Sequence, residues 1–195
     1  VRDNPSLLDD VTLVVENKLD DRVLEELRRK LHSTVADDAG FLSGFAPTFF
    51  ERSFAGDDAV RYAGQLFCGR IDRIDVDAEG HAVIIDYKGG LDRSYSPTGS
   101  ADALQVRHAQ ALIYARIAQR SFGLDVVGSL YRSYRTREVE GALSKGARIG
   151  APFDSHVYEA GRESMLDFQE LLDATERSVE AAIADADLLL LVADV

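Results

Sequence analysis

The segment HAVIIDYKGG, residues 81–90, runs four consecutive apolar residues directly into Asp86, Tyr87 and Lys88. An apolar run of this length, rich in β-branched residues, predicts a buried strand. Side chains alternate across a strand, so Asp86 and Lys88 share one face while Tyr87 points to the other. A carboxylate and an ammonium are both costly to bury unpaired. The pattern therefore raises the question of what this charged pair does at the end of a buried strand.

A second predicted strand, GRIDRIDV at residues 69–76, precedes this one, and residues 78–80 predict a hairpin turn between them. Pairing through the turn would bring Asp72 and Asp86 to one site. Two converging carboxylates repel each other unless a divalent cation lies between them. Oxygen ligands of this kind suit Mg²⁺ or Mn²⁺. A nearby Lys88 could then stabilise charge that develops on a phosphate, which outlines a site for phosphodiester hydrolysis.

The same residues also have a simpler explanation. On a surface hairpin, Asp72, Asp86 and Lys88 would form an ordinary solvated ion pair with no ligand between them. The presence of a lysine favours the chemical interpretation, because arginine outnumbers lysine eighteen to four in this chain and the two cations are not interchangeable. Spacing alone leaves both interpretations open.

The composition indicates a folded domain without a disulfide framework. Of 195 residues, 46% are hydrophobic and 29% are charged, which is typical of a globular protein with a sizeable core. The net charge of −12 means that a nucleic-acid role cannot rest on an overall basic surface. The one cysteine, Cys68, excludes an internal disulfide and an iron–sulfur cluster within this chain, and it indicates a reducing, cytoplasmic compartment. No apolar run approaches the ~20 residues that span a bilayer, so we expect no membrane association.

Periodicity predicts a mixed α/β fold. The predicted order is helix, three strands, helix, strand and helix, at residues 19–31, 49–54, 66–76, 81–88, 102–122, 126–134 and 163–190. Residues 89–100 are rich in Gly, Ser, Asp and Pro and predict a loop after the charged pair.

Four motifs occur in an order and spacing that resemble a known family: FFERSF (49–54), FCGRIDRIDV (67–76), VIIDYKGG (83–90) and QALIY (110–114). Together they resemble the RecB-like branch of the PD-(D/E)XK nuclease superfamily. More narrowly, they resemble the C-terminal nuclease domain of an AddB-type helicase–nuclease subunit. The resemblance implies a restriction-endonuclease-like α/β core, with a central mixed sheet of about four or five strands flanked by helices.

The resemblance also implies one nuclease domain over residues 1–195, with its core at about 45–135 and a C-terminal helix at about 163–190. Because the sequence lacks a starting methionine, we interpret it as a fragment of a larger protein. The implied activity is that of an Mg²⁺- or Mn²⁺-dependent exodeoxyribonuclease in DNA repair and recombination. The implied partners are DNA and a helicase subunit of a helicase–nuclease complex.

Carried over residue by residue, the resemblance makes Asp72 and Asp86 metal ligands, together with the backbone carbonyl of Tyr87. Lys88 becomes the catalytic lysine. Where the family commonly has Thr or Ser after this lysine, the chain has Gly89.

Gln110 and Tyr114 match the family's Gln-x-x-x-Tyr pair. Their i, i+4 spacing puts both on one helix face, from which they could reach the lysine, the acids or a phosphate. The alternative is a core tyrosine beside a solvated glutamine. Glu51 matches the family's acid before the first core strand, and an exposed strand residue is its alternative.

The remaining candidates are less specific. His32 is the candidate on the first helix for the metal-binding histidine of many relatives, although a capping or solvated histidine would look the same. Arg132 and Arg135 follow the last core strand and are candidate DNA contacts; a solvated strand end is the alternative.

Two other classes of function remain open. A nuclease-fold DNA-binding or scaffolding module without activity would keep the fold but lose the acids or the lysine, and this chain retains all three. A protein-interaction domain would explain the negative charge, since phosphate contacts require Lys or Arg.

Overall fold

The computed structural model describes residues 21–38, 40–56 and 59–185, and the chain divides into two units, residues 1–40 and 41–195. The described part of the first unit contains one long helix, α2 (Asp21–Asp38). This helix was predicted to end at residue 31 and instead continues to Asp38, because residues 32–38 contain no glycine or proline to end it.

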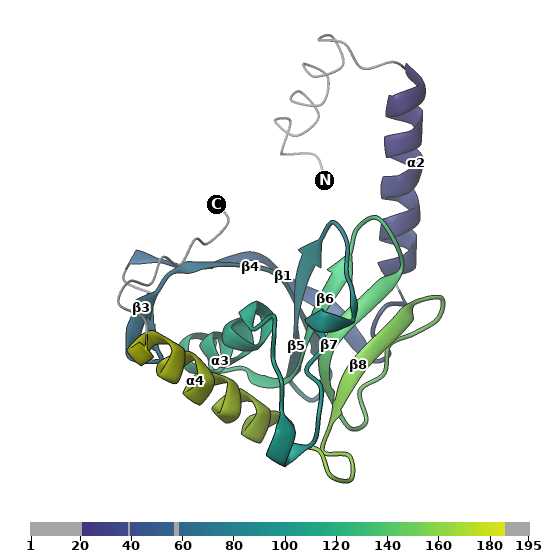
Figure 1. Ribbon diagram of the computed structural model, residues 1–195. Helices are drawn as coiled ribbons and strands as arrows, with labels where there is room; N and C mark the ends of the chain where they lie inside the picture. Colours follow the sequence, from purple (N-terminus) through teal and green to yellow (C-terminus); the bar gives the residue numbers. More distant parts are fainter. Residues whose placement is uncertain (1–20, 39, 57–58, 186–195) are drawn as a thin grey trace. The chain divides into compact units, whose positions relative to one another are not determined.

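The second unit is built on a six-stranded mixed sheet with the order β1-β4-β5-β6-β7-β8 (Figure 1). Its strands are β1 (Phe45–Phe54), β4 (Gly69–Asp77), β5 (His81–Lys88), β6 (Asp125–Ser133), β7 (Glu138–Ser144) and β8 (Asp154–Ala160). The pairs β1–β4, β4–β5 and β6–β7 are antiparallel, whereas β5–β6 and β7–β8 are parallel. A separate hairpin consists of β2 (Val60–Tyr62) and β3 (Gln65–Phe67).

Helix α3 (Gln110–Phe122) connects the parallel strands β5 and β6, as a crossover between parallel strands requires. It ends at Gly123, whose φ of 64° lies in the left-handed region that glycine adopts without strain. Helix α4 (Phe168–Asp185) follows β8. Two short 3-10 helices, η2 (Arg93–Tyr95) and η3 (Ala101–Ala103), lie in the connection between β5 and α3.

Helix α3 begins at Gln110 rather than at residue 102 as predicted. The reason is a pair of backbone hydrogen bonds between Thr98 and Gln105, at 3.0 and 2.8 Å, which commit this segment to a bridge. A residue whose amide is paired in this way cannot also join a helical ladder. The predicted loop at 89–100 accordingly contains ordered turns.

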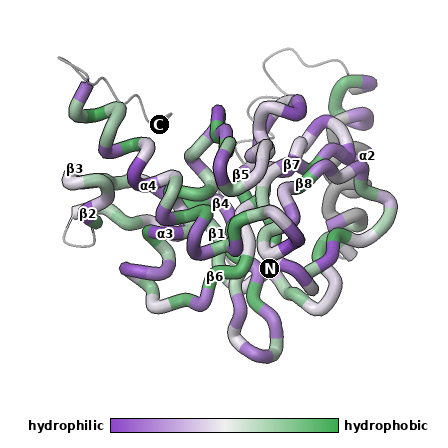
Figure 2. Tube along the Cα trace, turned by 60° about the horizontal axis from the view of Figure 1, so that its bottom comes forward, coloured by the Kyte–Doolittle hydropathy of each residue, from purple (hydrophilic) through white to green (hydrophobic). Residues whose placement is uncertain are grey.

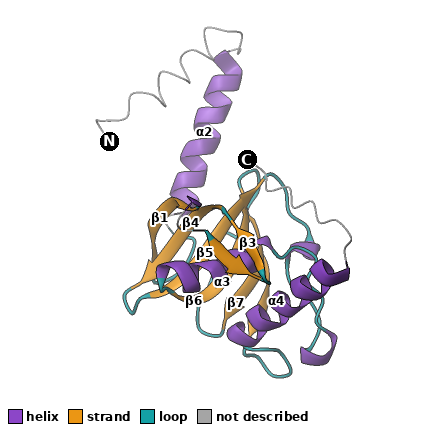
Figure 3. Ribbon diagram, turned by 90° about the vertical axis from the view of Figure 1, so that its left-hand side faces the viewer, coloured by secondary structure: helices purple, strands orange, loops and turns teal. Residues whose placement is uncertain are grey.

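The two faces of the sheet are covered differently. On one face, sheet residues such as Ile74 and Ile84 pack with Leu112 of α3 and Leu171 of α4 in one apolar cluster, and Figure 3 shows both helices beside the strands. On the other face, Val83, Ile85 and Leu130 pack against the segments at 41–45 and 147–153. Figure 2 shows that hydrophobic segments gather where the strands meet α3.

The predicted α/β class, with a central mixed sheet flanked by helices, is confirmed. The strand number was too low, because β7 and β8 were not predicted. Gly141 and the charged residues Glu138 and Glu140 interrupt the apolar pattern of β7. Glu140 is nevertheless buried, because Ser96 donates to its carboxylate at 2.6 Å from the β5–α3 connection. A partner from a distant segment therefore satisfies this buried carboxylate.

Candidate active site

Asp72 and Asp86 lie on neighbouring strands and on the same face of the sheet. The β4–β5 pairing runs through Ile74↔Ile84 and Arg73↔Ile85, and Ile74 and Ile84 as opposed residues share a face. Strand alternation puts Asp72 on the face of Ile74 and Asp86 on the face of Ile84. The acids therefore lie on the face of Ile74 and Ile84, which is the face that α3 covers.

Asp86 is almost completely buried, with 3% of its surface exposed, and the Lys88 ammonium lies 2.9 Å from its Oδ2. Burial is the largest influence on this carboxyl and raises its pKa to about 6, and the charge of Asp72 acts in the same direction. The Lys88 ammonium opposes both effects. A carboxyl whose pKa is raised this far lies in an environment that disfavours its charged form.

A chain of contacts leads from Asp86 to helix α3. The Lys88 Nζ donates to Gln110 Oε1 at 2.9 Å, and Gln110 Nε2 donates to the Tyr114 hydroxyl at 3.0 Å. Tyr114 in turn packs edge-on against Phe54 of β1, with ring centroids 5.6 Å apart. The structure thus brings together the charged pair of β5 and the Gln-x-x-x-Tyr pair of α3.

The pKa of Lys88 is raised above its ordinary value. Burial acts to lower it, but the hydrogen bond and charge of Asp86 and the charge of Asp72 outweigh this effect. Burial and the two acids also raise the pKa of the Tyr114 hydroxyl. Lys88 is therefore a cation and Tyr114 a neutral hydroxyl near pH 7.

Tyr87 joins the two strands through its backbone. Its N–H donates to Asp72 Oδ2 at 2.9 Å, and its hydroxyl accepts from Arg73 Nη1 at 2.9 Å on the other face of the sheet. Arg73 also makes two bonds to the buried Asp75, at 2.6 and 2.7 Å. Sequence reasoning assigned Arg73 and Asp75 no role, although their alternation with Asp72 in RIDRIDV was the available signal.

The position of α3 depends on Tyr131 of β6, which was also not predicted. The N-cap residue of α3, Ala109, provides no side-chain cap. Instead the Tyr131 hydroxyl accepts from the Ala111 N–H at 2.9 Å and donates to the His108 carbonyl at 3.2 Å. Tyr131 is the β6 partner of Asp86, so one strand pair positions both the acid and the start of the helix.

Of the two remaining ligand candidates, Glu51 and His32, only Glu51 has a described side chain. Glu51 lies in β1, but its carboxylate pairs with the exposed Arg70 at 2.5 Å. Its φ of 51° is unusual for a residue that is not glycine. His32 belongs to α2 in the other unit, and its side chain lies outside the described residues.

The two predicted DNA contacts differ sharply. The prediction that Arg132 contacts DNA is wrong, because its side chain is 1% exposed. It donates to the Thr136 carbonyl at 2.6 Å and stacks over the Phe153 ring at 4.6 Å, so it holds the β6–β7 turn from inside. Both faces of β6 are covered at this point, so Arg132 is buried, whereas Arg135 lies beyond the strand and is exposed.

Another group with ligand potential lies at the opposite end of the β4–β5 hairpin. Asp77, Glu79 and His81 place one potential ligand atom each within 4.8 Å of one another. His81 Nδ1 lies 2.8 Å from Asp77 Oδ2, and Asp77 also accepts the backbone N–H groups of Glu79 and His81. These bonds explain the cluster as a turn that closes the hairpin.

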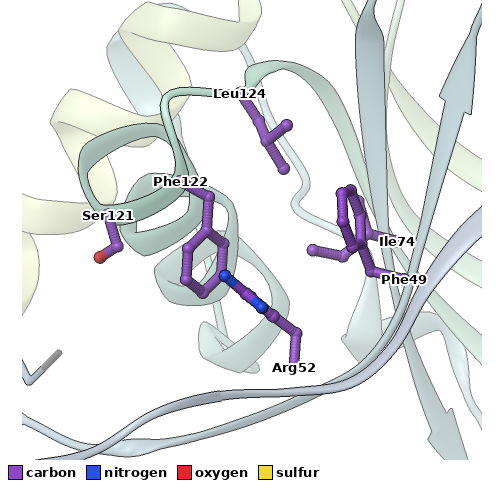
Figure 4. Close-up of a pocket in the computed structure, with 6 residues that line it drawn as sticks. All are labelled: Phe49, Arg52, Ile74, Ser121, Phe122 and Leu124. Atoms are coloured by element: carbon purple, nitrogen blue, oxygen red, sulfur yellow. The ribbon is translucent and has the colours of Figure 1, made fainter.

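A pocket of about 250 Å³ between β1 and the end of α3 is shown in Figure 4. The Arg52 guanidinium lies over the Phe122 ring at 4.8 Å, and the other lining residues are Phe49, Ile74, Ser121 and Leu124. The lining contains no acid, so this pocket lacks the groups that phosphodiester hydrolysis requires.

Two acids and a lysine thus lie on neighbouring strands of a mixed sheet beneath a helix, an arrangement whose chemistry suits phosphodiester hydrolysis. Comparison with protein families agrees with this description. The chain belongs to the PD-(D/E)XK nuclease superfamily, whose family model matches residues 6–188. The sheet and its helices are accordingly consistent with the restriction-endonuclease-like fold.

No curated protein matches the chain in a separate comparison. Among the described residues, none of the helices is long and apolar enough to cross a membrane.

The donor set of the site fits the divalent cation that nucleases of this superfamily use. Asp72 and Asp86 are hard oxygen donors on one face of the sheet, and such donors suit Mg²⁺ or Mn²⁺. Burial raises the pKa of Asp86 even with the Lys88 ammonium beside it. A bound cation would stabilise the ionised carboxylate.

Proposed function

We propose that this chain is a metal-dependent DNA nuclease of the RecB-like branch, similar to the nuclease domain of an AddB-type helicase–nuclease subunit. The observation that carries the proposal is the continuous contact chain Asp86–Lys88–Gln110–Tyr114 beside Asp72. Its members come from β4, β5 and α3, and a solvated surface ion pair would not require a buried acid or a glutamine that accepts from the lysine.

In the proposed site, Asp72, Asp86 and the Tyr87 carbonyl hold Mg²⁺ or Mn²⁺. The cation would neutralise charge on the phosphate and favour hydrolysis when bound. Lys88 stabilises the negative charge that develops on the phosphate oxygens in the transition state. Gln110 fixes the position of the ammonium through its 2.9 Å bond, and Tyr114 fixes Gln110.

The proposed setting follows from the resemblance of the motifs. The domain would act as an exonuclease in DNA repair and recombination, in the cytoplasm, next to a helicase subunit that supplies the DNA strand. The negative net charge supports a separate DNA-binding subunit, because a chain with a net charge of −12 is a poor general DNA binder by itself. The domain over residues 1–195 would then be one part of a helicase–nuclease complex.

An inactive DNA-binding or scaffolding module is the second candidate. The 2.9 Å ion pair between Asp86 and Lys88 is the observation that favours it, because a buried acid and a partly buried lysine can be paired for structural reasons alone.

A digestion assay separates the two candidates. End-labelled linear DNA is incubated with the chain in Mg²⁺ or Mn²⁺, with Asp86→Ala as the inactive variant and His81→Gln as a matched control at the other end of the hairpin. We expect cleavage by the parent and by His81→Gln, and none by Asp86→Ala. Cleavage that survives in Asp86→Ala would contradict the proposed site, and a parent that binds DNA without cutting it would favour the scaffolding module.

A further inference from the structure

Gly89 follows the proposed catalytic lysine, and the reason for a glycine there is a neighbouring ring. A Cβ added at Gly89 would lie 3.0 Å from the Tyr134 hydroxyl oxygen and 3.4 Å from its Cζ. Contacts this short would require the ring to move by a few tenths of an ångström. At Gly90, by contrast, an added Cβ would meet nothing within 4 Å. The glycine at position 89 therefore makes room for Tyr134 against the end of β5.

Tyr134 is a large aromatic residue that remains 52% exposed at the end of β5. Its backbone N–H donates to the Lys88 carbonyl at 3.0 Å, which fixes its position relative to the lysine. The Arg135 guanidinium carbon lies 5.6 Å from the centre of the Tyr134 ring. An exposed ring and a cation thus lie together, one residue past the charged pair of β5.

The turn that carries this pair is supported from within. Ser133 Oγ accepts from the backbone N–H groups of Arg135 and Thr136, at 3.3 and 3.1 Å. From below, the buried Arg132 donates to the Thr136 carbonyl at 2.6 Å. The ring and the guanidinium are therefore presented from an ordered turn.

We propose that Tyr134 and Arg135 form a nucleotide subsite next to the cleavage site, with a base stacked on the ring and a phosphate on the guanidinium. Aromatic rings bind bases of any sequence by stacking, and arginine binds phosphate with a planar fork of donors. Both faces of a base inside a duplex are already covered. The subsite consequently selects a nucleotide with a free base face, in a single strand or at a strand end.

This subsite rests on the nuclease function proposed above, so its test uses binding without metal. Fluorescein-labelled dT10 is titrated with the 195-residue chain in EDTA, and anisotropy gives the dissociation constant; a blunt ten-base-pair duplex is titrated in parallel. We expect Tyr134→Leu to weaken binding of dT10 about tenfold and Tyr134→Phe less than about twofold, because phenylalanine keeps the stacking surface. The duplex should bind more weakly than dT10 and respond less to Tyr134→Leu.

Matched controls exclude a general effect of surface change. Phe50 of β1 is 62% exposed, and its partner Arg73 in β4 lies on the sheet face opposite the site, so Phe50→Leu should bind dT10 as the parent does. Gly89→Ala should weaken binding slightly because it moves the ring by a few tenths of an ångström, whereas Gly90→Ala should not. For the cation, Arg135→Gln should weaken binding severalfold, and Arg162→Gln, at an exposed turn after β8, should leave it unchanged.

The outcomes separate this inference from the nuclease proposal. A parent that does not bind dT10, or a Tyr134→Leu variant that binds as the parent does, overturns the subsite even if the chain cuts DNA. Equal losses in Tyr134→Leu and Phe50→Leu overturn it as well. A loss confined to the Tyr134, Gly89 and Arg135 variants supports the subsite even if no cleavage is detected.

Discussion

Lys88 and Asp86 form an ion pair, yet we expect their substitutions to affect metal binding and cleavage differently. Lys88→Ala leaves both proposed carboxylate ligands in place, so cation binding should persist or strengthen as a neighbouring positive charge is removed. Cleavage should fall by about 10²-fold or more, because a transition-state charge loses its partner. Lys88→Arg should not restore it, since a planar guanidinium does not replace a compact ammonium. Calorimetric metal titration and DNA digestion measure the two effects. If Lys88→Ala cleaves DNA as fast as the parent does, the lysine has no catalytic role.

The raised pKa of Asp86 predicts how metal binding depends on pH. With a pKa of about 6, this carboxyl is mostly protonated at pH 5 and mostly ionised at pH 7. A proton and a cation compete for it, so Mg²⁺ affinity should be about tenfold weaker at pH 5 than at pH 7. An ordinary aspartate would give almost no change over this range. Titrations at the two pH values test this, and an affinity that does not vary would place the cation elsewhere.

The same shift has a consequence for stability in the absence of metal. The folded-state pKa of Asp86 lies above the unfolded-state value of 3.8, so the folded protein holds the proton more tightly. The contribution of this group to stability is therefore present at low pH and is lost as pH rises between about 4 and 6. Asp86→Asn should abolish this loss. Urea unfolding of the parent and the variant at pH 4 and pH 7 measures the change in the free energy of unfolding.

Glu51 combines a left-handed backbone with an exposed ion pair to Arg70, and two substitutions separate strain from ligation. At a φ of 51°, glycine avoids the Cβ clash that alanine keeps, so Glu51→Gly should be more stable than Glu51→Ala by about 1 kcal/mol. Both variants lose the carboxylate. If Glu51 ligates the cation, the two should lose cleavage equally; chemical denaturation and digestion of DNA give the two comparisons.

Helix α3 carries Gln110 and Tyr114, and its first turn is held by a tyrosine from the neighbouring strand rather than by a capping residue. Tyr131→Phe removes the hydroxyl that accepts from Ala111 and should cost about 1–2 kcal/mol of stability. It should also lower kcat, because Gln110 loses its fixed position relative to Lys88. KM should change less, since the substrate surface is intact.

Tyr158→Phe is the matched control for that variant. Its hydroxyl accepts from the Leu166 N–H at 2.9 Å, and its side chain is 3% exposed, so a similar bond is lost beside α4. The two variants should therefore lose similar stability while only Tyr131→Phe loses kcat. A parallel fall in kcat for both would mean that destabilisation alone explains the effect.

The whole chain carries a net charge of −12, so its DNA contacts must be few and local. If Lys88 and Arg135 supply the phosphate contacts, the logarithm of the affinity for dT10 should fall with the logarithm of salt concentration at a slope of about −1 to −2. Arg135→Gln should make that slope shallower by about 0.7, the contribution of one phosphate contact to a single strand. A steep slope of about −5 would reveal an extended basic surface elsewhere.

Local sequence was sufficient for the hairpin that carries the two acids. The turn at residues 78–80 and the alternation on either side of it specify which residues oppose each other, because the contacts are only about fourteen residues apart. The shared face of Asp72 and Asp86 follows from this pattern, whereas the α/β class was predicted from the periodicity of the whole chain. The i, i+4 spacing of Gln110 and Tyr114 likewise specifies that they share a helix face.

The tertiary structure decided what periodicity does not encode. Whether Arg132 faces solvent or the Phe153 ring depends on which segment covers the second face of the sheet. The buried Glu140 of β7 depends on Ser96, forty-four residues earlier, and the start of α3 depends on a hydroxyl from β6. Each of these outcomes satisfies a buried polar group with a partner distant in sequence. A pattern of neighbouring residues specifies which groups need such partners, and only the packing of the chain specifies which groups supply them.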